Sequence, residues 1–391
     1  MALHFSREEL AGRRRRACQA MTKRGLDGLV LFRQESMYYL TGYDTSGYSM
    51  FQGMYLGADG SLALCTRSPD LRQAGMTSVV EDIRIWRDRA GASPGEDLRD
   101  MLADHGCRGR RLGVEYHAYG LTAQRGKMVD AALEGFCRTE DASDLVRLLR
   151  VVKSPAELAY VRRAGQLADA ALAAANRVTV PGTAVGRIRA EMLEPILAAD
   201  GDLSASRWPM GAGKEALLVR YHTGQGTVGK NDQVTFEFAS AYRHYHTALM
   251  HVVLTGKVDR RHRDMFRACA DALDACQATL RPGRTVGEVF DAHARTFTKS
   301  GYKGHFLNAC GYTMGATYPP TWMDEPMVYT GNPQVLAPGM VFFLHMILLN
   351  SRTGLTMSLG ETSIVTARGC EPVTHAPREL VVNNGPPVAV Q

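Results

Sequence analysis

Apolar and polar residues along the first part of the chain follow helical and strand periods in turn. Residues 7–24 have a helical, arginine-rich pattern that ends at Gly25, and the apolar run DGLVLF follows as a strand. Further strands are predicted in MYLGADGSLALCT and RRLGVEY, and helices in PGEDLRDMLADHG and AYGLTAQRGKMVDAAL. This alternation predicts an α/β domain over residues 1–148.

The pattern changes near residue 149. VVKSPAELAYVRRAGQLADAALAAANRV begins with Ser154, Pro155 and Glu157, which is a helix-start signature, and RRHRDMFRACADALDACQATL predicts a second long helix. VTFEFASAYRHYHTALMHVVLTG, MVFFLHMILLN and GETSIVTARG predict strands, the first of them as a hairpin. Helices that alternate with hairpins indicate an antiparallel α+β sheet over residues 149–391.

The predicted hairpin FEFASAYRHYHTAL carries one acid and two histidines. A turn at Arg243 would place Glu237 opposite Ala248, so that His246 would lie diagonally from Glu237 on the same sheet face. A carboxylate and an imidazole on one sheet face are two groups that can serve as a general acid/base pair. The alternative is that His244 and His246 only lie near an exposed hairpin tip. Glu237 has apolar neighbours, and burying an unpaired carboxylate costs several kcal/mol.

Composition narrows the class of protein. The chain has 391 residues, 45% of them hydrophobic, which is enough for two domains with filled cores. It has no long apolar window and no apolar signal core behind its first charges, so we expect no membrane association and a cytoplasmic location. The formal charge of +6 is modest, and the RRRR run fits a solvated helix face, so no nucleic-acid partner is expected. The eight cysteines form no CxxC pair, which favours reduced thiols.

Several stretches together resemble the pita-bread superfamily of creatinase, aminopeptidase P, prolidase and methionine aminopeptidase. They are VKSPAELAYVRRAG, the hairpin that follows KNDQVTFEF, LRPGRTVGEVF and LAPGMVFF. The resemblance covers most of the chain and implies a C-terminal pita-bread catalytic domain after a creatinase/prolidase-type N-terminal domain. It also implies a homodimer, in which an N-terminal domain reaches toward the active site of its neighbour.

Metallopeptidases of this superfamily hold two metal ions with two aspartates, one histidine and two glutamates. The resemblance places these five positions on Glu237, Ala248, Tyr312, His345 and Gly360. Only one of the five is a carboxylate, and Glu237 with His345 would make at most a weak mononuclear site. We therefore expect neither a metal nor another cofactor.

The loss of these ligands resembles the metal-free branch typified by creatinase and ectoine hydrolase. YRHYHTA, GYTMGATYPPTW and MYYLTGYD carry this likeness. It implies a metal-independent hydrolase that cleaves a C–N bond in a small amidine- or guanidine-like zwitterion, as in the ring opening of ectoine. The glutamates that hold the guanidinium in creatinase correspond to Met250 and Gly360, so creatine itself is not the expected substrate.

The expected reaction requires attack on an amidine carbon and protonation of the departing nitrogen. Glu237 would attack the carbon, deprotonate a water molecule or hold the amidinium, and the sequence does not choose among these roles. His222, which matches the acid/base histidine of creatinase, is the expected proton shuttle, with His246 assisting. Glu361 would be a second acidic contact to the cation; the alternative is a buried acid at a strand end.

Five further residues are expected to contact the small-molecule substrate. Tyr312 and Trp322 offer flat surfaces for a delocalised cation, although core packing would also explain them. His345 and Tyr221 would line the pocket, and Arg207 would bind a substrate carboxylate.

Three other functions stay open at this point. A metallopeptidase that cleaves Xaa-Pro bonds would need a bound transition metal. A non-catalytic binding protein would need no polar set in its pocket. A lyase acting on C–S or C–O bonds of a small zwitterion would use the same fold.

Overall fold

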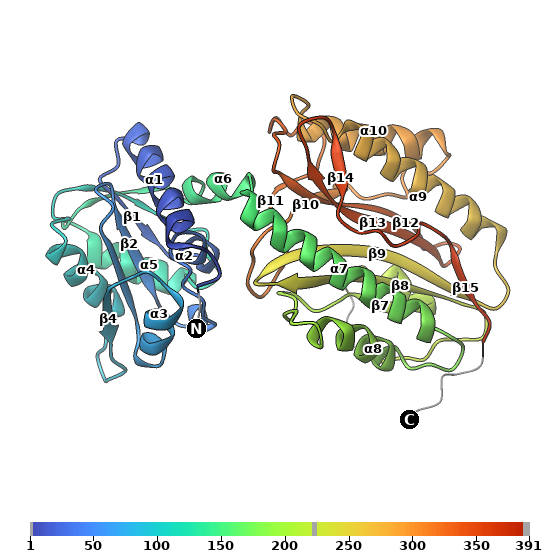
Figure 1. The fold of residues 1–391 in the computed structure, drawn as a ribbon, viewed down its shortest axis with the longest axis horizontal. Coiled ribbons are helices and arrows are strands. Elements are labelled where there is room, and N and C mark those ends of the chain that lie inside the picture. The colour runs from blue at the N-terminus through green and yellow to red at the C-terminus, as the bar shows by residue number, and fades with distance from the viewer. Residues whose placement is uncertain (1–2, 221–224, 386–391) are drawn as a thin grey trace. The chain divides into compact units, whose positions relative to one another are not determined.

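The computed structural model describes residues 3–220 and 225–385 (Figure 1). The described part of the chain divides between Arg150 and Val151 into two compact units. None of the described helices is both long and apolar enough to cross a membrane.

The first unit is a mixed sheet with helices on both faces. Its elements are α1 (Arg7–Arg24), β1 (Gly28–Leu31), α2 (Gln34–Thr41), η1 (Gly47–Ser49), β2 (Gly53–Gly57), β3 (Leu62–Arg67), η2 (Ser68–Asp70), α3 (Leu71–Thr77), β4 (Asp82–Trp86), α4 (Pro94–Asp104), β5 (Arg111–Val114), α5 (Ala123–Leu133), β6 (Arg138–Asp141) and α6 (Leu145–Val151). The strand order is β4-β3-β2-β1-β5-β6, with β1 parallel to β5 and antiparallel to β2. The predicted α/β architecture is confirmed.

The arginine-rich helix shows why the local sequence folds in this way. Ser6 accepts a hydrogen bond from the backbone N–H of Glu9 at the start of α1, and Gly25 ends the helix with φ of 68°. Only glycine takes that left-handed conformation without a steric penalty. The start and the end of α1 are therefore both encoded by residues next to the arginine run.

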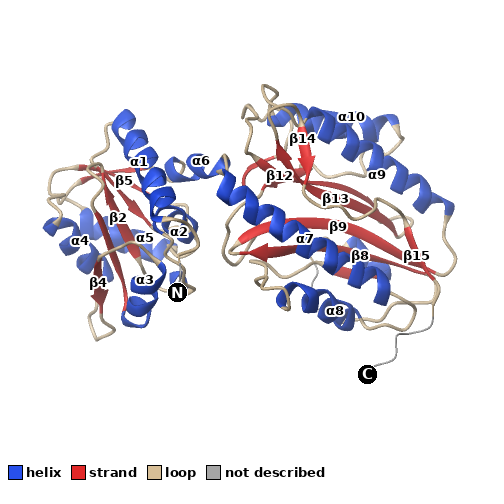
Figure 2. Cartoon of the chain, viewed as in Figure 1, coloured by secondary structure: helices blue, strands red, loops and turns tan. Residues whose placement is uncertain are grey.

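The second unit is a large, mostly antiparallel sheet flanked by two helix pairs. Its elements are α7 (Pro155–Val178), α8 (Val185–Leu197), β7 (Met210–Ala212), η3 (Gly213–Leu217), β8 (Asp232–Tyr242), β9 (Tyr245–Thr255), α9 (Arg260–Thr279), α10 (Val286–Lys299), β10 (Gly311–Thr313), β11 (Asp324–Met327), β12 (Val341–Asn350), β13 (Leu355–Val365), β14 (Cys370–Pro372) and β15 (Val381–Asn383). The order is β11-β10-β12-β13-β9-β8-β7, with β14 beside β13 and β15 beside β9. The predicted α+β class is confirmed (Figure 2).

Helices α7 and α9 cover the same face of this sheet. The hydroxyl of Thr247 on β9 donates to the carbonyl of Val161 on α7 at 2.9 Å. Glu361 on β13 is paired with Leu249 on β9, and it accepts a hydrogen bond from Gln277 of α9. Because paired residues and residues two apart along a strand share a face, Thr247, Leu249 and Glu361 all point toward the helices. We call this side the helix-covered face and the other side the open face.

The predicted register of the hairpin is wrong by two residues. Tyr242 pairs with Tyr245, so the turn consists of Arg243 and His244, and Glu237 pairs with Met250 rather than with Ala248. Both turn residues have positive φ, 49° and 66°, which is the backbone of a type I′ turn. This turn matches the right-handed twist of the strands, and it is held by a hydrogen bond from the N–H of His244 to Asp202.

The start of α10 provides a test of the fold. Thr285 and Glu288 form a capping box, in which each side chain accepts a hydrogen bond from the other residue's backbone N–H. Replacing Thr285 by Ala is expected to lower the unfolding free energy by about 1 kcal/mol. Thr285→Ser, which keeps the hydroxyl, should lose much less. Urea unfolding followed by circular dichroism measures both; equal stability of the Ala and Ser variants would contradict the capping role.

Candidate active site on the open face

The open face carries a row of facing residues across four strands. Glu237 on β8 pairs with Met250 on β9, Met250 with Gly360 on β13, and Gly360 with His345 on β12. Tyr312 on β10 pairs with Phe343, which is two residues from His345 and therefore on the same face. The register alone thus brings Glu237, His345 and Tyr312 to one side of the sheet.

Ala248 completes the set of positions that the resemblance assigned to metal ligands. It is two residues from Met250 on β9, so it shares the open face. All five positions, Glu237, Ala248, Tyr312, His345 and Gly360, therefore lie on one face. The structure retains the geometry of that site with different side chains.

Glu237 is the acceptor at the end of a chain of hydrogen bonds. The indole N–H of Trp322 donates to the hydroxyl oxygen of Tyr312 at 2.8 Å, and the Tyr312 hydroxyl donates to Oε1 of Glu237 over 3.4 Å. An indole nitrogen can only donate, so the phenol keeps its own proton for Glu237. Burial raises the pKa of Tyr312 well above its usual value, which keeps that donor protonated. Tyr312 and Trp322 thus orient the carboxyl group of Glu237.

Burial raises the pKa of Glu237 to about 7, against the opposing influence of the nearby Arg220 cation and of the Tyr312 hydrogen bond. At neutral pH the group is therefore poised between its acid and its base form. A carboxyl group in this state can accept a proton or donate one, which is what general acid/base chemistry requires.

Arg220 is a site residue that sequence reasoning missed. Its charge acts on Glu237, on Tyr312 and on His345, so its guanidinium group lies near all three. Arg220 lies in the VRYHTG motif, directly before the predicted site residues Tyr221 and His222. The charge of Arg220 thus acts on the poised carboxyl group of Glu237.

His345 is a neutral imidazole beside Tyr312. Burial lowers its pKa to about 4, and the centroids of the Tyr312 and His345 rings are 5.8 Å apart. Its Nδ1 is buried and has no hydrogen-bond partner among the described residues. A buried polar atom without a partner is costly, so this nitrogen is available to a water molecule or a ligand.

One small cavity among the described residues lies beside Glu237. A cavity of about 20 Å³ is lined by Glu237, Met250, Thr235, Ile347, Thr356, Ser358 and Phe236, and is closed by Pro209, Ala216, Leu218 and Val219. That volume is close to what one water molecule occupies.

His246 does not face Glu237 diagonally, because it pairs with Ala241. Its Nε2 accepts a hydrogen bond from the N–H of Ala205 at 2.9 Å, which leaves the proton on Nδ1 to be donated to Thr317 at 3.1 Å. Burial lowers the pKa of His246 to about 3. Both ring nitrogens are engaged, so His246 holds two loops in place, and the expectation that it assists Glu237 is corrected.

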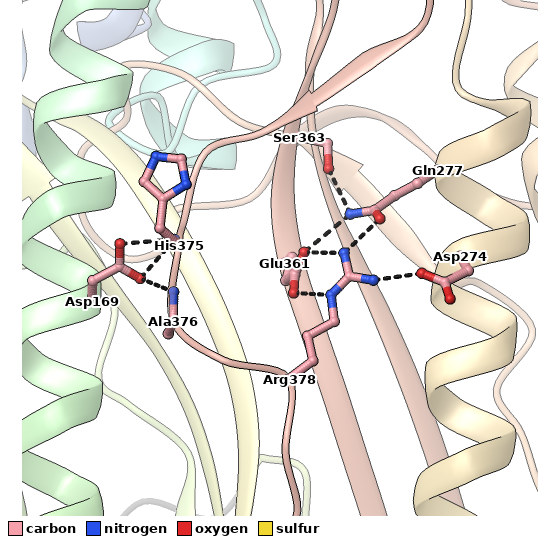
Figure 3. A network of polar contacts seen from close by, with 8 residues as sticks. All are labelled: Asp169, Asp274, Gln277, Glu361, Ser363, His375, Ala376 and Arg378. Carbon is pink, nitrogen blue, oxygen red and sulfur yellow. Dashed lines mark hydrogen bonds and ion pairs between the residues drawn. The ribbon is translucent and has the colours of Figure 1, made fainter.

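Glu361 lies on the helix-covered face, so the expectation that it joins Glu237 around a substrate cation is also corrected. Figure 3 shows that the guanidinium of Arg378 donates two hydrogen bonds to the carboxylate of Glu361. Gln277 of α9 also donates to this carboxylate, at 3.1 Å. Arg378 also reaches Asp274, and Asp169 of α7 accepts the backbone N–H groups of His375 and Ala376. Glu361 therefore holds Arg378, and Asp169 holds residues 375 and 376, on the helix-covered face.

Of the remaining predicted residues, only Arg207 is described, and it does not join the group around Glu237. Arg207 is exposed and lines a separate cavity. Tyr221 and His222 fall outside the described residues.

The side chains on the open face do not fit a two-metal cluster. The described residues contain no group of three His, Cys, Asp or Glu side chains placed to hold a metal ion. A Cβ at Gly360 would lie 2.9 Å from the ring of Phe343, so that ring fills the space a ligand side chain would need. The Arg220 cation near Glu237 adds repulsion to any second cation.

The chain folds into two units. On the open face of the second unit, the five positions that the resemblance assigned to metal ligands carry other side chains, of which only Glu237 is a carboxylate. The model of metallopeptidase family M24 matches residues 159–367, and that of the creatinase/prolidase N-terminal domain matches residues 13–152. The chain therefore belongs to metallopeptidase family M24, and the predicted pita-bread superfamily is confirmed.

Individual relatives match along nearly the whole chain. Ectoine hydrolase from Halomonas elongata is 26% identical over 98% of this chain and 99% of its own, and an uncharacterised hydrolase/peptidase from Sinorhizobium fredii is 29% identical over the same shares. Among solved structures, dipeptidase PepE from Mycobacterium ulcerans superposes with a TM-score of 0.84 at 22% identity, covering 97% of this chain and 99% of that one. Hydrolases of more than one kind thus share this architecture.

The raised pKa of Glu237 predicts a pH-dependent stability. The pKa rises from 4.5 to about 7 on folding, so the folded protein binds this proton more tightly than the unfolded chain. The associated stabilisation is fully present below pH 4.5 and is lost as the pH rises to about 7. Glu237→Gln has no such proton, so its stability relative to the wild type should rise by up to about 3 kcal/mol between pH 4.5 and 8. Urea unfolding at several pH values measures this, and a difference that does not vary with pH would contradict it.

The ion pair on the helix-covered face gives a second test. Arg378→Met leaves the Glu361 carboxylate buried without its main partner and should lower the unfolding free energy by about 1–3 kcal/mol. The double variant with Glu361→Gln should recover part of the loss, because the buried charge is removed as well. Thermal unfolding of both single variants and the double variant measures the coupling; strictly additive losses would show that the pair does not interact.

Proposed function

We propose that this protein is a metal-independent hydrolase that cleaves a C–N bond in a small amidine- or guanidine-like zwitterion, in the manner of ectoine hydrolase. The observation that carries the proposal is the poised carboxyl group of Glu237 beside the Arg220 cation, on the face where the other metal-ligand positions are Ala248, Tyr312, His345 and Gly360. The likeness to ectoine hydrolase over 98% of the chain supports the same class.

A zwitterion complements the two charges on this face. The amidinium end of such a substrate matches the carboxylate form of Glu237, and its carboxylate end matches Arg220. A cationic amidinium near Glu237 also favours the ionised form of that carboxyl group and lowers its pKa from about 7. Substrate binding would thereby prepare Glu237 as a nucleophile or a base.

The protons of the reaction have identifiable carriers. Hydrolysis needs a group that takes a proton from water or attacks the amidine carbon, and a group that protonates the departing nitrogen. Glu237 serves the first step from its carboxylate form, and after taking a proton it can return it to the leaving nitrogen. Tyr312 is held by Trp322 with its hydroxyl proton directed at Glu237, so it stabilises the ionised form during the first step.

Metal analysis combined with a substrate screen tests the proposal. The screen contains ectoine, other cyclic amidines, guanidines, N-acyl amino acids and Xaa-Pro dipeptides, each with and without a chelator. We expect turnover of an amidine-type zwitterion that is unaffected by the chelator, and at least a ~100-fold loss of kcat in Glu237→Gln. The matched control is Glu379→Gln, which alters an exposed acid and should keep wild-type activity.

Two outcomes would overturn the proposal. Stoichiometric manganese, cobalt or iron together with dipeptide turnover abolished by the chelator would identify a metallopeptidase instead. Amidine turnover that survives unchanged in Glu237→Gln would remove Glu237 from the reaction and the argument with it.

A further inference from the structure

A second and larger cavity lies at the edge of the sheet beside α8. It has a volume of about 590 Å³, which is within the usual range for small-molecule sites. Its lining consists of Arg189, Leu193, Leu203, Ser204, Ala205, Ser206, Arg207, Trp208, Pro319 and Pro320. None of these residues lines the cavity beside Glu237, so the two spaces are distinct.

Two arginines give this cavity its charge. Nη2 of Arg189 donates to the carbonyl of Trp208 at 3.3 Å, while its Nε is buried and has no hydrogen-bond partner among the described residues. Burial, and then the charge of Arg207, lower the pKa of Arg189. A desolvated cation is costly, and an anion in the cavity would offset the charges of Arg189 and Arg207. No acidic side chain is found among the lining residues that the structure describes.

Apart from Ser204 and Ser206, the rest of the lining is apolar and includes an aromatic face. The indole N–H of Trp208 is already engaged with the hydroxyl of Ser204 at 2.8 Å and the carbonyl of Ala239 at 3.1 Å, so the ring contributes only apolar surface. Leu193, Leu203 and the two prolines extend this surface. Such a wall favours a ligand with a flat apolar body next to its charged group.

The walls are held in place from outside the cavity. Ala205 donates its N–H to the buried ring of His246, and that ring also bonds Thr317, two residues before Pro319. The loop that carries Ala205 and the loop that carries the prolines are therefore tied to the same histidine. A cavity with fixed walls loses little conformational entropy when a ligand binds.

We propose that this cavity is a second ligand site, which binds a monocarboxylate with an aromatic body through Arg189 and Arg207. The two cations and the lack of acidic lining residues disfavour a zwitterion, so the ligand differs in class from the substrate proposed for Glu237. A bare phosphate would leave the Trp208 and proline surface uncovered, which favours an arylcarboxylate over a small inorganic anion.

Calorimetric titration of the full-length protein with phenylacetate and indole-3-acetate tests this site. We expect saturable binding of at least one of them, and at least tenfold weaker binding of the matching neutral amide and of inorganic phosphate. Arg189→Gln should weaken carboxylate binding by about tenfold or more, and Arg189→Lys by less. The control Arg187→Gln changes an exposed arginine on the same helix, which pairs with Glu191, and should bind as the wild type does.

The outcomes distinguish this site from the one at Glu237. Glu237→Gln should leave arylcarboxylate binding unchanged, so loss of binding in that variant would assign the ligand to the open face and overturn the proposal. Equal binding of phosphate and arylcarboxylate, or equal weakening by Arg187→Gln and Arg189→Gln, would indicate general surface charge and also overturn it. So would the absence of saturable binding at millimolar concentrations, provided that circular dichroism shows the protein to be folded.

Discussion

The alternation of side chains across paired strands is the constraint on which the rest of the second unit depends. Glu237, Met250, Gly360 and His345 face one another across four strands, and one residue further along any strand points to the opposite side. Glu361 illustrates the consequence. It neighbours Gly360 in sequence, yet it lies on the helix-covered face with Arg378 and Gln277 (Figure 3). A shift of one residue thus separates a position on the open face from a side chain that holds Arg378 on the other face.

Burial and the neighbouring positive charge have opposite effects on the pKa of Glu237. Their balance determines whether this carboxyl group can act as an acid or a base. Removal of the carboxyl group from water raises its pKa, while Arg220 and Tyr312 lower it, and the balance falls at about 7. The histidines differ, because burial lowers the pKa of His345 to about 4 and of His246 to about 3 without a compensating anion. Of these three groups, Glu237 alone titrates near neutral pH, which is why it carries the proposed chemistry.

Local signals in the sequence predicted much of the fold. α1 was predicted at its observed bounds, because Ser6, Gly25 and the periodic residues between them agree. Helices α8 and α10 were missed. α8 contains Pro195, which normally argues against a helix, and α10 mixes β-branched and aromatic residues, although its Thr285–Glu288 capping box was a readable signal.

The site was less predictable, because it depends on contacts between segments distant in sequence. The two-residue period of a strand predicted which residues share a sheet face with Glu237. It did not predict the residue that pairs with Glu237 on the next strand. That register is set by a two-residue turn, Arg243 and His244, which lacks the usual glycine or asparagine. The ion pair between Arg378 and Glu361 joins residues that are 17 positions apart in the sequence. The partners of His246 come from two loops, at Ala205 and Thr317, which no local pattern connects.

The two faces of the large sheet have different functions. This explains how the fold is retained when the residues at the metal-ligand positions change. Ser240, Thr247 and Glu361 make contacts that attach helices to the sheet, and these three residues are on the helix-covered face. Ala248 and Gly360 on the open face have no part in these contacts, and the ring of Phe343 packs into the space above Gly360. Replacing side chains on the open face therefore leaves the packing of the helices intact. The chemistry of that face can diverge while strand register keeps its positions aligned.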